Sequence, residues 1–145
     1  MTATAVTQHD PIADHTHIER LINRFVEAIK KQQPLAQQQL IFKLLKTDFM
    51  HHMKWEEAVL FALYDATSGL RSGPTRMLRA EHAEIELMIR SLEKEQDKGY
   101  SETTVFRLAD FIREHAEKEK AILYPVIGEQ IKRKKRGADY REAIA

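Results

Sequence analysis

HMKWEEAVLFAL, at residues 52–63, has a near copy at residues 115–126, HAEKEKAILYPV. The two copies match His52 with His115 and Glu56 with Glu119, and similar apolar residues come after each pair. Because an α-helix advances about 100° per residue, a glutamate one turn after a histidine lies about 40° from it on the same face. Each copy can therefore aim an imidazole and a carboxylate at one point.

The apolar neighbours of these pairs predict that they face the protein interior. On a helical wheel, the residues within roughly 80° of His52 are Leu45, Phe49, Val59, Leu60 and Leu63. His115 is flanked in the same way by Leu108, Phe111, Ile112, Ile122, Leu123 and Val126. Burying histidine and glutamate is costly unless a charged or hydrogen-bonding group satisfies them. A metal ion would do both.

The helices that precede the two copies also repeat. The first contains Asp14, His15, Ile18, Glu19 and Ile22 where the third has Glu81, His82, Ile85, Glu86 and Ile89. The chain therefore reads as two similar helical hairpins, which predicts an all-α fold, an antiparallel up-down-up-down four-helix bundle. Its inward-facing polar residues are predicted to be His15, His52, Glu56, His82, His115 and Glu119.

Caps and helix breakers set the expected helix bounds. Proline is favoured at the first position of a helix, and serine is favoured at the N-cap. With Pro11, Pro34, Pro74 and Ser101 in these roles, we expect helices over residues 11–32, 34–66, 74–98 and from 101 onward. A loop is expected at 67–74 and a bend at Pro125. Residues 1–145 form a single domain in this interpretation, with a flexible arm at 1–10 and a basic helix end and tail at 132–145.

Composition excludes several classes of function. The 23 Lys and Arg against 22 Asp and Glu leave a net charge of +1, so no global field favours nucleic acid or a membrane. The basic run at 132–136 lacks the interleaved aromatic residues that would favour nucleic acid. The absence of cysteine excludes thiolate catalysis, disulfides and cysteine-ligated metals. With neither a signal-peptide pattern nor an apolar spanning segment, we expect a cytoplasmic protein with no membrane partner.

The predicted interior set supplies four imidazoles and two carboxylates. Nitrogen and oxygen donors without thiolate suit iron or manganese, with zinc as an alternative. Two glutamates can bridge metal ions roughly 3.5–4 Å apart while the histidines occupy the outer positions. The sequence therefore predicts a binuclear non-haem metal site.

In these motifs the chain resembles the hemerythrin-like, or HHE cation-binding, domains. The resemblance covers residues 14–127 and depends on DHTHI around His15, HMKWEEAVLF from His52, EHAEI around His82 and HAEKEKAILYP from His115. It implies a four-helix bundle with two non-haem iron ions joined by an oxo or hydroxo bridge. Carried over, the four histidines would be terminal ligands, with Glu56 and Glu119 bridging.

This sequence departs from the family pattern in two places. Oxygen-carrying hemerythrins have a further histidine one turn after the third-helix ligand, and here that position is Glu86. A carboxylate there can bind the metal directly, bind it through water or lie outside the coordination shell, and we include Glu86 in the predicted ligand set. It disfavours a simple oxygen carrier. The chain also lacks the cysteine-bearing N-terminal segment typical of the relatives linked to iron–sulfur cluster repair.

Other polar residues near the motifs are assigned more ordinary roles. His51 lies about 100° from the predicted ligand face and is expected to face solvent, as is His17. Glu57 and Lys120, which come directly after the two bridging glutamates, are expected to be surface charges. Tyr124 lies about 180° from His115 on the wheel, which favours packing between helices.

Three functions are consistent with the sequence. The first is a non-haem di-iron protein that binds or senses a small diatomic ligand, oxygen or nitric oxide, or that handles iron. The second is a di-iron oxidoreductase that acts on peroxide, oxygen or nitric oxide at the same site. The third is a metal-free helical module that binds a partner protein. The sequence leaves the oligomeric state open, monomer or dimer.

Overall fold

The computed structural model describes residues 11–68 and 73–126, and this part of the chain consists of helices and short connections without a strand, in agreement with the predicted all-α class. The elements are α2 (Pro11–Lys30), α3 (Leu35–Trp55), the π-helical turn η1 (Glu56–Leu60), α4 (Phe61–Ser68), α5 (Pro74–Glu95) and α6 (Glu102–Ile122). The expected arm at 1–10, the middle of the expected 67–74 loop and the basic end at 132–145 lie outside the described residues.

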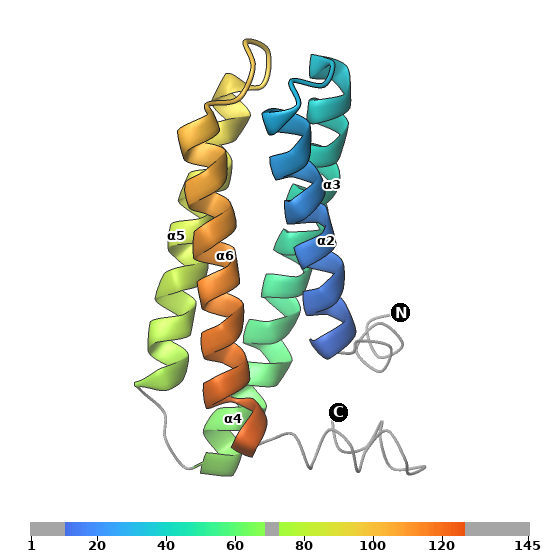
Figure 1. Cartoon of the computed structure of the whole chain (residues 1–145). Helices are drawn as coiled ribbons and strands as arrows, with labels where there is room; N and C mark the ends of the chain where they lie inside the picture. The colour runs from blue at the N-terminus through green and yellow to red at the C-terminus, as the bar shows by residue number, and fades with distance from the viewer. Residues whose placement is uncertain (1–10, 69–72, 127–145) are drawn as a thin grey trace, which may run out of the picture.

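The long helices α2, α3, α5 and α6 form a bundle (Figure 1). The connections between α2 and α3 and between α5 and α6 lie at one end of the bundle, and α4 lies at the other. α2 packs against both α3 and α6, and α6 also packs against α5. Residues from both halves of the chain therefore meet inside one bundle.

Local signals explain where the helices begin. α2 and α5 begin at Pro11 and Pro74, and the Ser101 hydroxyl caps α6 by accepting a hydrogen bond from the Thr104 N–H at 3.3 Å. These starts agree with the sequence prediction. α6 ends at Ile122, a turn follows at Leu123, and residues 124–126 are helical again. The regular helix is therefore interrupted close to Pro125, which has no N–H to bond to the carbonyl four residues back.

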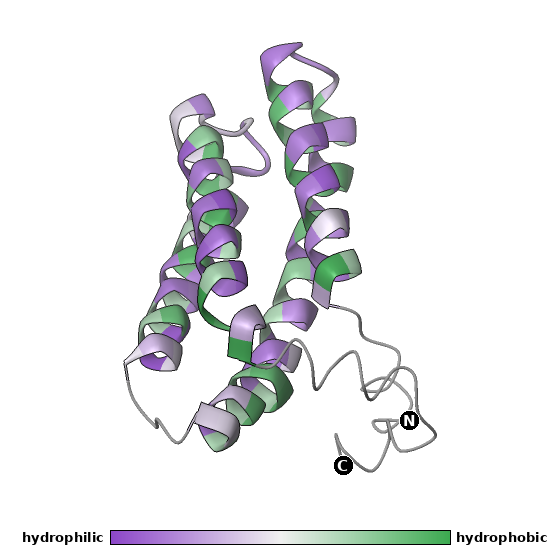
Figure 2. Cartoon of the chain, turned by 60° about the horizontal axis from the view of Figure 1, so that its bottom comes forward, coloured by the Kyte–Doolittle hydropathy of each residue, from purple (hydrophilic) through white to green (hydrophobic). Residues whose placement is uncertain are grey.

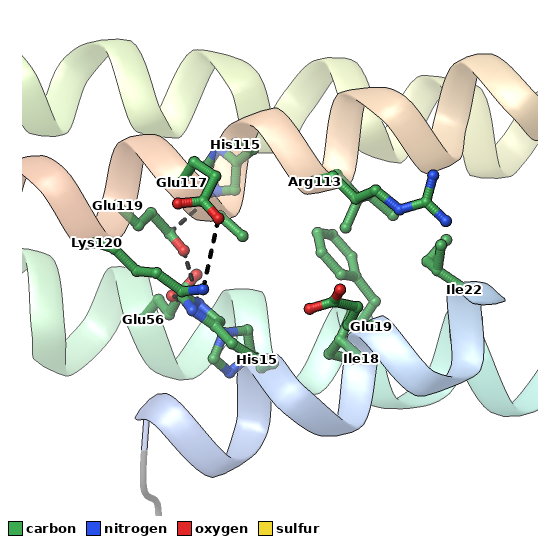
Figure 3. Close-up of a pocket in the computed structure, with 14 residues that line it drawn as sticks. His15, Ile18, Glu19, Ile22, Glu56, Arg113, His115, Glu117, Glu119 and Lys120 are labelled. Carbon is green, nitrogen blue, oxygen red and sulfur yellow. Dashed lines mark hydrogen bonds and ion pairs between the residues drawn. The ribbon is translucent and has the colours of Figure 1, made fainter.

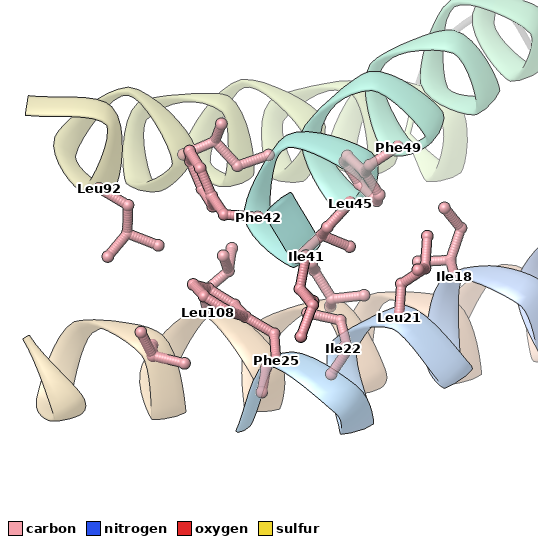
Figure 4. Packing of buried hydrophobic residues seen from close by; sticks show 14 of the residues in the cluster. Ile18, Leu21, Ile22, Phe25, Ile41, Phe42, Leu45, Phe49, Leu92 and Leu108 are labelled. Atoms are coloured by element: carbon pink, nitrogen blue, oxygen red, sulfur yellow. The ribbon is translucent and has the colours of Figure 1, made fainter. Parts of the chain in front are cut away.

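Apolar residues of the long helices face inward, and Figure 2 shows hydrophobic and hydrophilic segments alternating along each of them. In the described residues, the larger apolar cluster fills the half of the bundle nearer the two connections, and Phe25 and Leu45 within it are fully buried (Figure 4). A smaller cluster closes the other end with Trp55, Leu60, Phe61, Tyr64, Leu78 and Leu123. Each fully buried large side chain stabilises the fold by about 1.5–3 kcal/mol.

The expected continuous helix over residues 34–66 is interrupted by the π-helical turn η1. There the Phe61 N–H bonds to the Glu56 carbonyl, five residues back, so the turn contains one more residue than an α-helical turn. The extra residue lies beside the predicted site, because Glu56 opens the turn. None of the helices in the described ranges, 11–68 and 73–126, is long and apolar enough to cross a membrane.

Candidate metal centre

Six of the seven predicted site residues converge between the two apolar clusters. Each of these side chains is at most 8% exposed. They come from every long helix and from η1, and they are His15, His52, Glu56, His82, His115 and Glu119. Figure 3 shows His15, Glu56, His115 and Glu119 pointing toward one another from three elements.

Glu56 divides its two carboxylate oxygens between different histidines. Its Oε2 lies 3.2 Å from His15 Nε2 and 3.0 Å from His52 Nε2. Its Oε1 lies 3.1 Å from His82 Nε2. The carboxylate therefore faces two separate groups of imidazole nitrogens.

The two carboxylate oxygens of Glu119 also face different histidines. Its Oε1 lies 2.8 Å from His15 Nε2, and its Oε2 lies 3.0 Å from His115 Nε2 and 3.5 Å from His82 Nε2. In the described part of the chain, this arrangement creates two sets of four donors suited to a metal ion. One set contains His15, His52, Glu56 and Glu119, and the other contains Glu56, His82, His115 and Glu119.

The spacing and the missing hydrogen bonds of the donors are compatible with metal coordination. Nε2 of His52 and of His115 each lie 3.0 Å from a carboxylate oxygen. Neither nitrogen makes a hydrogen bond to any of the described residues, because the geometry is not aligned for one. Metal–ligand bonds of about 2.1 Å at right angles place neighbouring donors about 3 Å apart. The observed spacing therefore allows these donors to be ligands of one ion.

The cluster balances its own charge in the metal-free protein. Burial alone would lower the pKa of His52 and His82, but nearby carboxylates outweigh it and raise the pKa to about 9 for His52 and about 10 for His82. Burial would raise the pKa of Glu56 and Glu119, but the close contacts of their oxygens with the histidine nitrogens hold both pKa values below their usual range. His52 and His82 are therefore protonated at neutral pH when no cation is bound, and the two glutamates are ionised.

The outer ring nitrogens of two histidines are held by carboxylates. His82 Nδ1–H donates to Glu57 Oε2 at 2.7 Å, and His115 Nδ1–H donates to Glu81 Oε1 at 2.8 Å. Such contacts fix the tautomer and leave Nε2 free to coordinate. Glu57 was expected to be a surface charge, and its side chain is 38% exposed, but it also accepts a hydrogen bond from His82 of α5. The repeat contained a signal for Glu81, since Glu81 and Asp14 both precede a cluster histidine.

The other two histidines have longer outer contacts. His52 Nδ1 lies 3.4 Å from Asp14 Oδ2, and His15 Nδ1 lies 3.4 Å from the Tyr124 hydroxyl. The Tyr124 ring also stacks on His15, with ring centroids 6.2 Å apart. The expectation that Tyr124 packs between helices is therefore met, but its hydroxyl also reaches the cluster.

Aromatic rings cover two of the imidazoles. Phe61 stacks on His82 with ring centroids 5.3 Å apart, and Trp55 stacks on His52 with centroids 6.2 Å apart. Both aromatic residues belong to the smaller apolar cluster, which lies next to the site. They shield these faces of the site from water.

The structure does not bring the seventh predicted residue, Glu86, to the cluster. Its Oε2 accepts hydrogen bonds from Arg90 Nη2 at 2.7 Å and from Arg90 Nε at 3.1 Å, on the partly exposed side of α5. Glu86 therefore does not belong to the proposed ligand set. His51 is exposed, and His17 is exposed and paired with Asp48 at 2.7 Å, so both face solvent as predicted.

A cavity of about 170 Å³ adjoins the cluster on the side of α2 and α6 (Figure 3). Its walls include Ile18, Ile22, Phe49 and Ile112, and five of the six cluster residues, all except His82, also line it. A single water needs only about 10–15 Å³ of such space. A small molecule therefore has room to approach the donor groups.

A helical bundle with these donor groups in its interior defines a cation-binding protein. The model of the hemerythrin HHE cation-binding domain family matches residues 11–127, and the chain belongs to this family. No curated protein and no solved structure matches the chain. The resemblance seen in the sequence motifs is thus confirmed.

Proposed function

We propose that this protein holds two non-haem iron ions inside an antiparallel up-down-up-down four-helix bundle and binds or senses oxygen or nitric oxide. The observation that supports two ions is the division of each buried carboxylate. Glu56 and Glu119 both place one oxygen among one set of donors and the other oxygen among the second set. A carboxylate with this placement would be able to bridge two ions.

The proposed ligand set comes from the same contacts. His15 and His52 would hold one ion, and His82 and His115 the other. Imidazole and carboxylate donors without thiolate favour iron or manganese over softer metals. When bound, an iron pair supplies a redox-active centre with affinity for small diatomic molecules.

The residues around the cluster suit such a ligand. The cavity reaches the donor groups, and its walls beyond them combine the apolar Ile18, Ile22 and Phe49 with the charged Glu19 and Arg113. The apolar part of the wall stabilises an uncharged diatomic molecule and disfavours bulk water. The protein therefore controls access, while its imidazoles and carboxylates hold the ions.

Metal analysis of protein produced with iron tests this proposal. The wild type is expected to retain two equivalents of iron, and His52→Gln is expected to lose at least one. His51→Gln is the matched control, because the neighbouring His51 is exposed, and it should retain both. Addition of oxygen or nitric oxide to the reduced protein should then change the visible spectrum. A wild type that never retains stoichiometric metal would refute the proposal.

An oxidoreductase acting on peroxide, oxygen or nitric oxide is the second candidate. The observation that favours it is the cavity, which lets a substrate reach Glu56 and Glu119. Assays with and without an electron donor separate the two functions. Repeated turnover would establish the enzyme, and uptake of one ligand per metal pair without turnover would establish the binding protein.

A further inference from the structure

In one proposed metal position, the outer ring nitrogen of each histidine makes a short hydrogen bond to a carboxylate. His82 and His115 each donate their outer N–H to a carboxylate, at 2.7 Å to Glu57 and at 2.8 Å to Glu81. The other oxygen of Glu81 accepts from Lys118, which lies on the solvent side and is 47% exposed. Both imidazoles are therefore oriented before any metal arrives.

In the other proposed metal position, the outer ring nitrogens of the histidines make longer contacts. His52 Nδ1 has a carboxylate oxygen of Asp14 at 3.4 Å, a longer contact than those of His82 and His115. His15 Nδ1 has the Tyr124 hydroxyl at 3.4 Å in place of a carboxylate. Both histidines line the cavity, whereas of the other pair only His115 does.

The difference between the two proposed metal positions arises from a change of residue between the two copies of the repeat. Glu57 comes directly after Glu56, and the matching residue after Glu119 is Lys120. The side chain of Lys120 lies beside the cavity and pairs with Glu117 at 3.7 Å. At the position where one copy has a carboxylate that accepts from a histidine, the other copy thus has a lysine that pairs with a glutamate.

A carboxylate behind a coordinating histidine makes its free nitrogen a stronger ligand. The acceptor draws the Nδ1 proton, increases electron density at Nε2 and fixes the ring orientation, and losing it typically costs about 10–100-fold in metal affinity. We propose that the two metal positions are unequal, that the His82–His115 position is tighter and fills first, and that Glu57 and Glu81 are the positioning residues responsible. This inference rests on the proposed function, since it requires two ions.

Titration of the metal-free protein with cobalt(II), monitored by visible absorption, tests the order of filling. Two steps of one equivalent each are expected, separated by about tenfold or more in affinity. His115→Gln should remove the tighter step, and His52→Gln should remove the weaker one. If His52→Gln removes the tighter step instead, the proposed order is wrong.

Charge-removing variants test the positioning residues. Glu57→Gln and Glu81→Gln should each weaken the tighter step by about 10–100-fold and leave the weaker step unchanged. Glu84→Gln is the matched control, because Glu84 is an exposed glutamate of α5 and its loss should change neither step. A purely structural role would lower the melting temperature of the metal-free variants but leave the ratio of the two affinities intact.

The reverse change tests the looser position. Lys120→Glu places a carboxylate at the position that matches Glu57 and is expected to tighten the weaker step. A single two-equivalent step in the wild type, unaltered by Glu57→Gln and Glu81→Gln, would overturn the inequality while leaving the proposed function standing. Failure of the wild type to bind cobalt or iron stoichiometrically would overturn the proposed function itself.

Discussion

Glu56 and Glu119 are each 1% exposed, so neither carboxylate can rely on water to stabilise its charge. An unpaired carboxylate at such a depth costs several kcal/mol. In the metal-free protein, the protonated histidines provide the compensating charge. When a cation binds, it takes over that role, and the histidines must become neutral to coordinate it. Metal binding and proton release are therefore coupled at these residues.

Metal uptake at pH 7 is expected to release about two protons per protein. Burial works against protonation, but the surrounding carboxylates raise the pKa of His52 to about 9 and that of His82 to about 10, so both are protonated at pH 7 without metal. Coordination requires the neutral ring, and apparent affinity should therefore fall as the pH falls. Calorimetric titrations in buffers of different ionisation enthalpy measure the proton count, and a heat independent of buffer would contradict this expectation.

The sequence identified the residues of the cluster but not the residues that contact the outer ring nitrogens of its histidines. His15, His52 and their counterparts are marked by a repeat and by apolar neighbours on the same helix, which a wheel can show. Glu57 contacts a histidine on another helix, and its own helix gives no sign of it. Tyr124 lies beyond the end of α6, where the angles of a regular helical wheel no longer apply.

At the level of the elements, the π-helical turn η1 sets the direction in which the side chains of α4 point. A π turn accommodates one extra residue. The side chains that follow it therefore keep the directions they would have in a regular α-helix without that residue. Leu60, Phe61 and Tyr64 thereby stay buried in the smaller apolar cluster, with Phe61 stacked on His82. Ala58, within the turn, is exposed.

Deletion of Ala58 is expected to leave the fold and the metal content unchanged. The deletion should convert the π turn into an α-helical turn without rotating the residues on either side. Deletion of Thr47, a residue of the regular part of α3, is the control. It should rotate everything beyond it by about 100° and abolish metal binding. Circular dichroism and metal analysis compare the two, and equal losses in both would show that η1 does not absorb the change.

The starts of the helices were predictable because proline and serine act on their own segment. Pro11, Pro74 and Ser101 mark observed starts. The helix ends and η1 were not predictable in the same way. They depend on packing against other helices, and the residues of η1, EEAVL, are ordinary for a regular α-helix.

For the whole molecule, the cluster is a link between the two halves of the duplicated chain. α2, α3 and η1 supply His15, His52 and Glu56, while α5 and α6 supply the remaining donors. Bound ions would thus connect the two hairpins at a point between the two apolar clusters. Because the unfolded chain cannot assemble these donors, the ions should stabilise the folded state selectively.

Removal of metal is therefore expected to lower the melting temperature. A ligand present at 100 times its dissociation constant stabilises a protein by about 2.7 kcal/mol, which for a domain of this size corresponds to roughly 5–10 °C. Scanning calorimetry with and without a chelator measures the shift. The double variant His52→Gln, His115→Gln should show little response to the chelator. An equal shift in that variant would place the effect at another site.

Trp55 is the chain's single tryptophan, and its indole lies against the ring of His52. Iron attached to that imidazole would accept excitation energy from the indole at very short range. The fluorescence of Trp55 should therefore report whether the neighbouring metal position is occupied. This intrinsic fluorescence should dim as the cation enters and recover as it leaves, without any added dye.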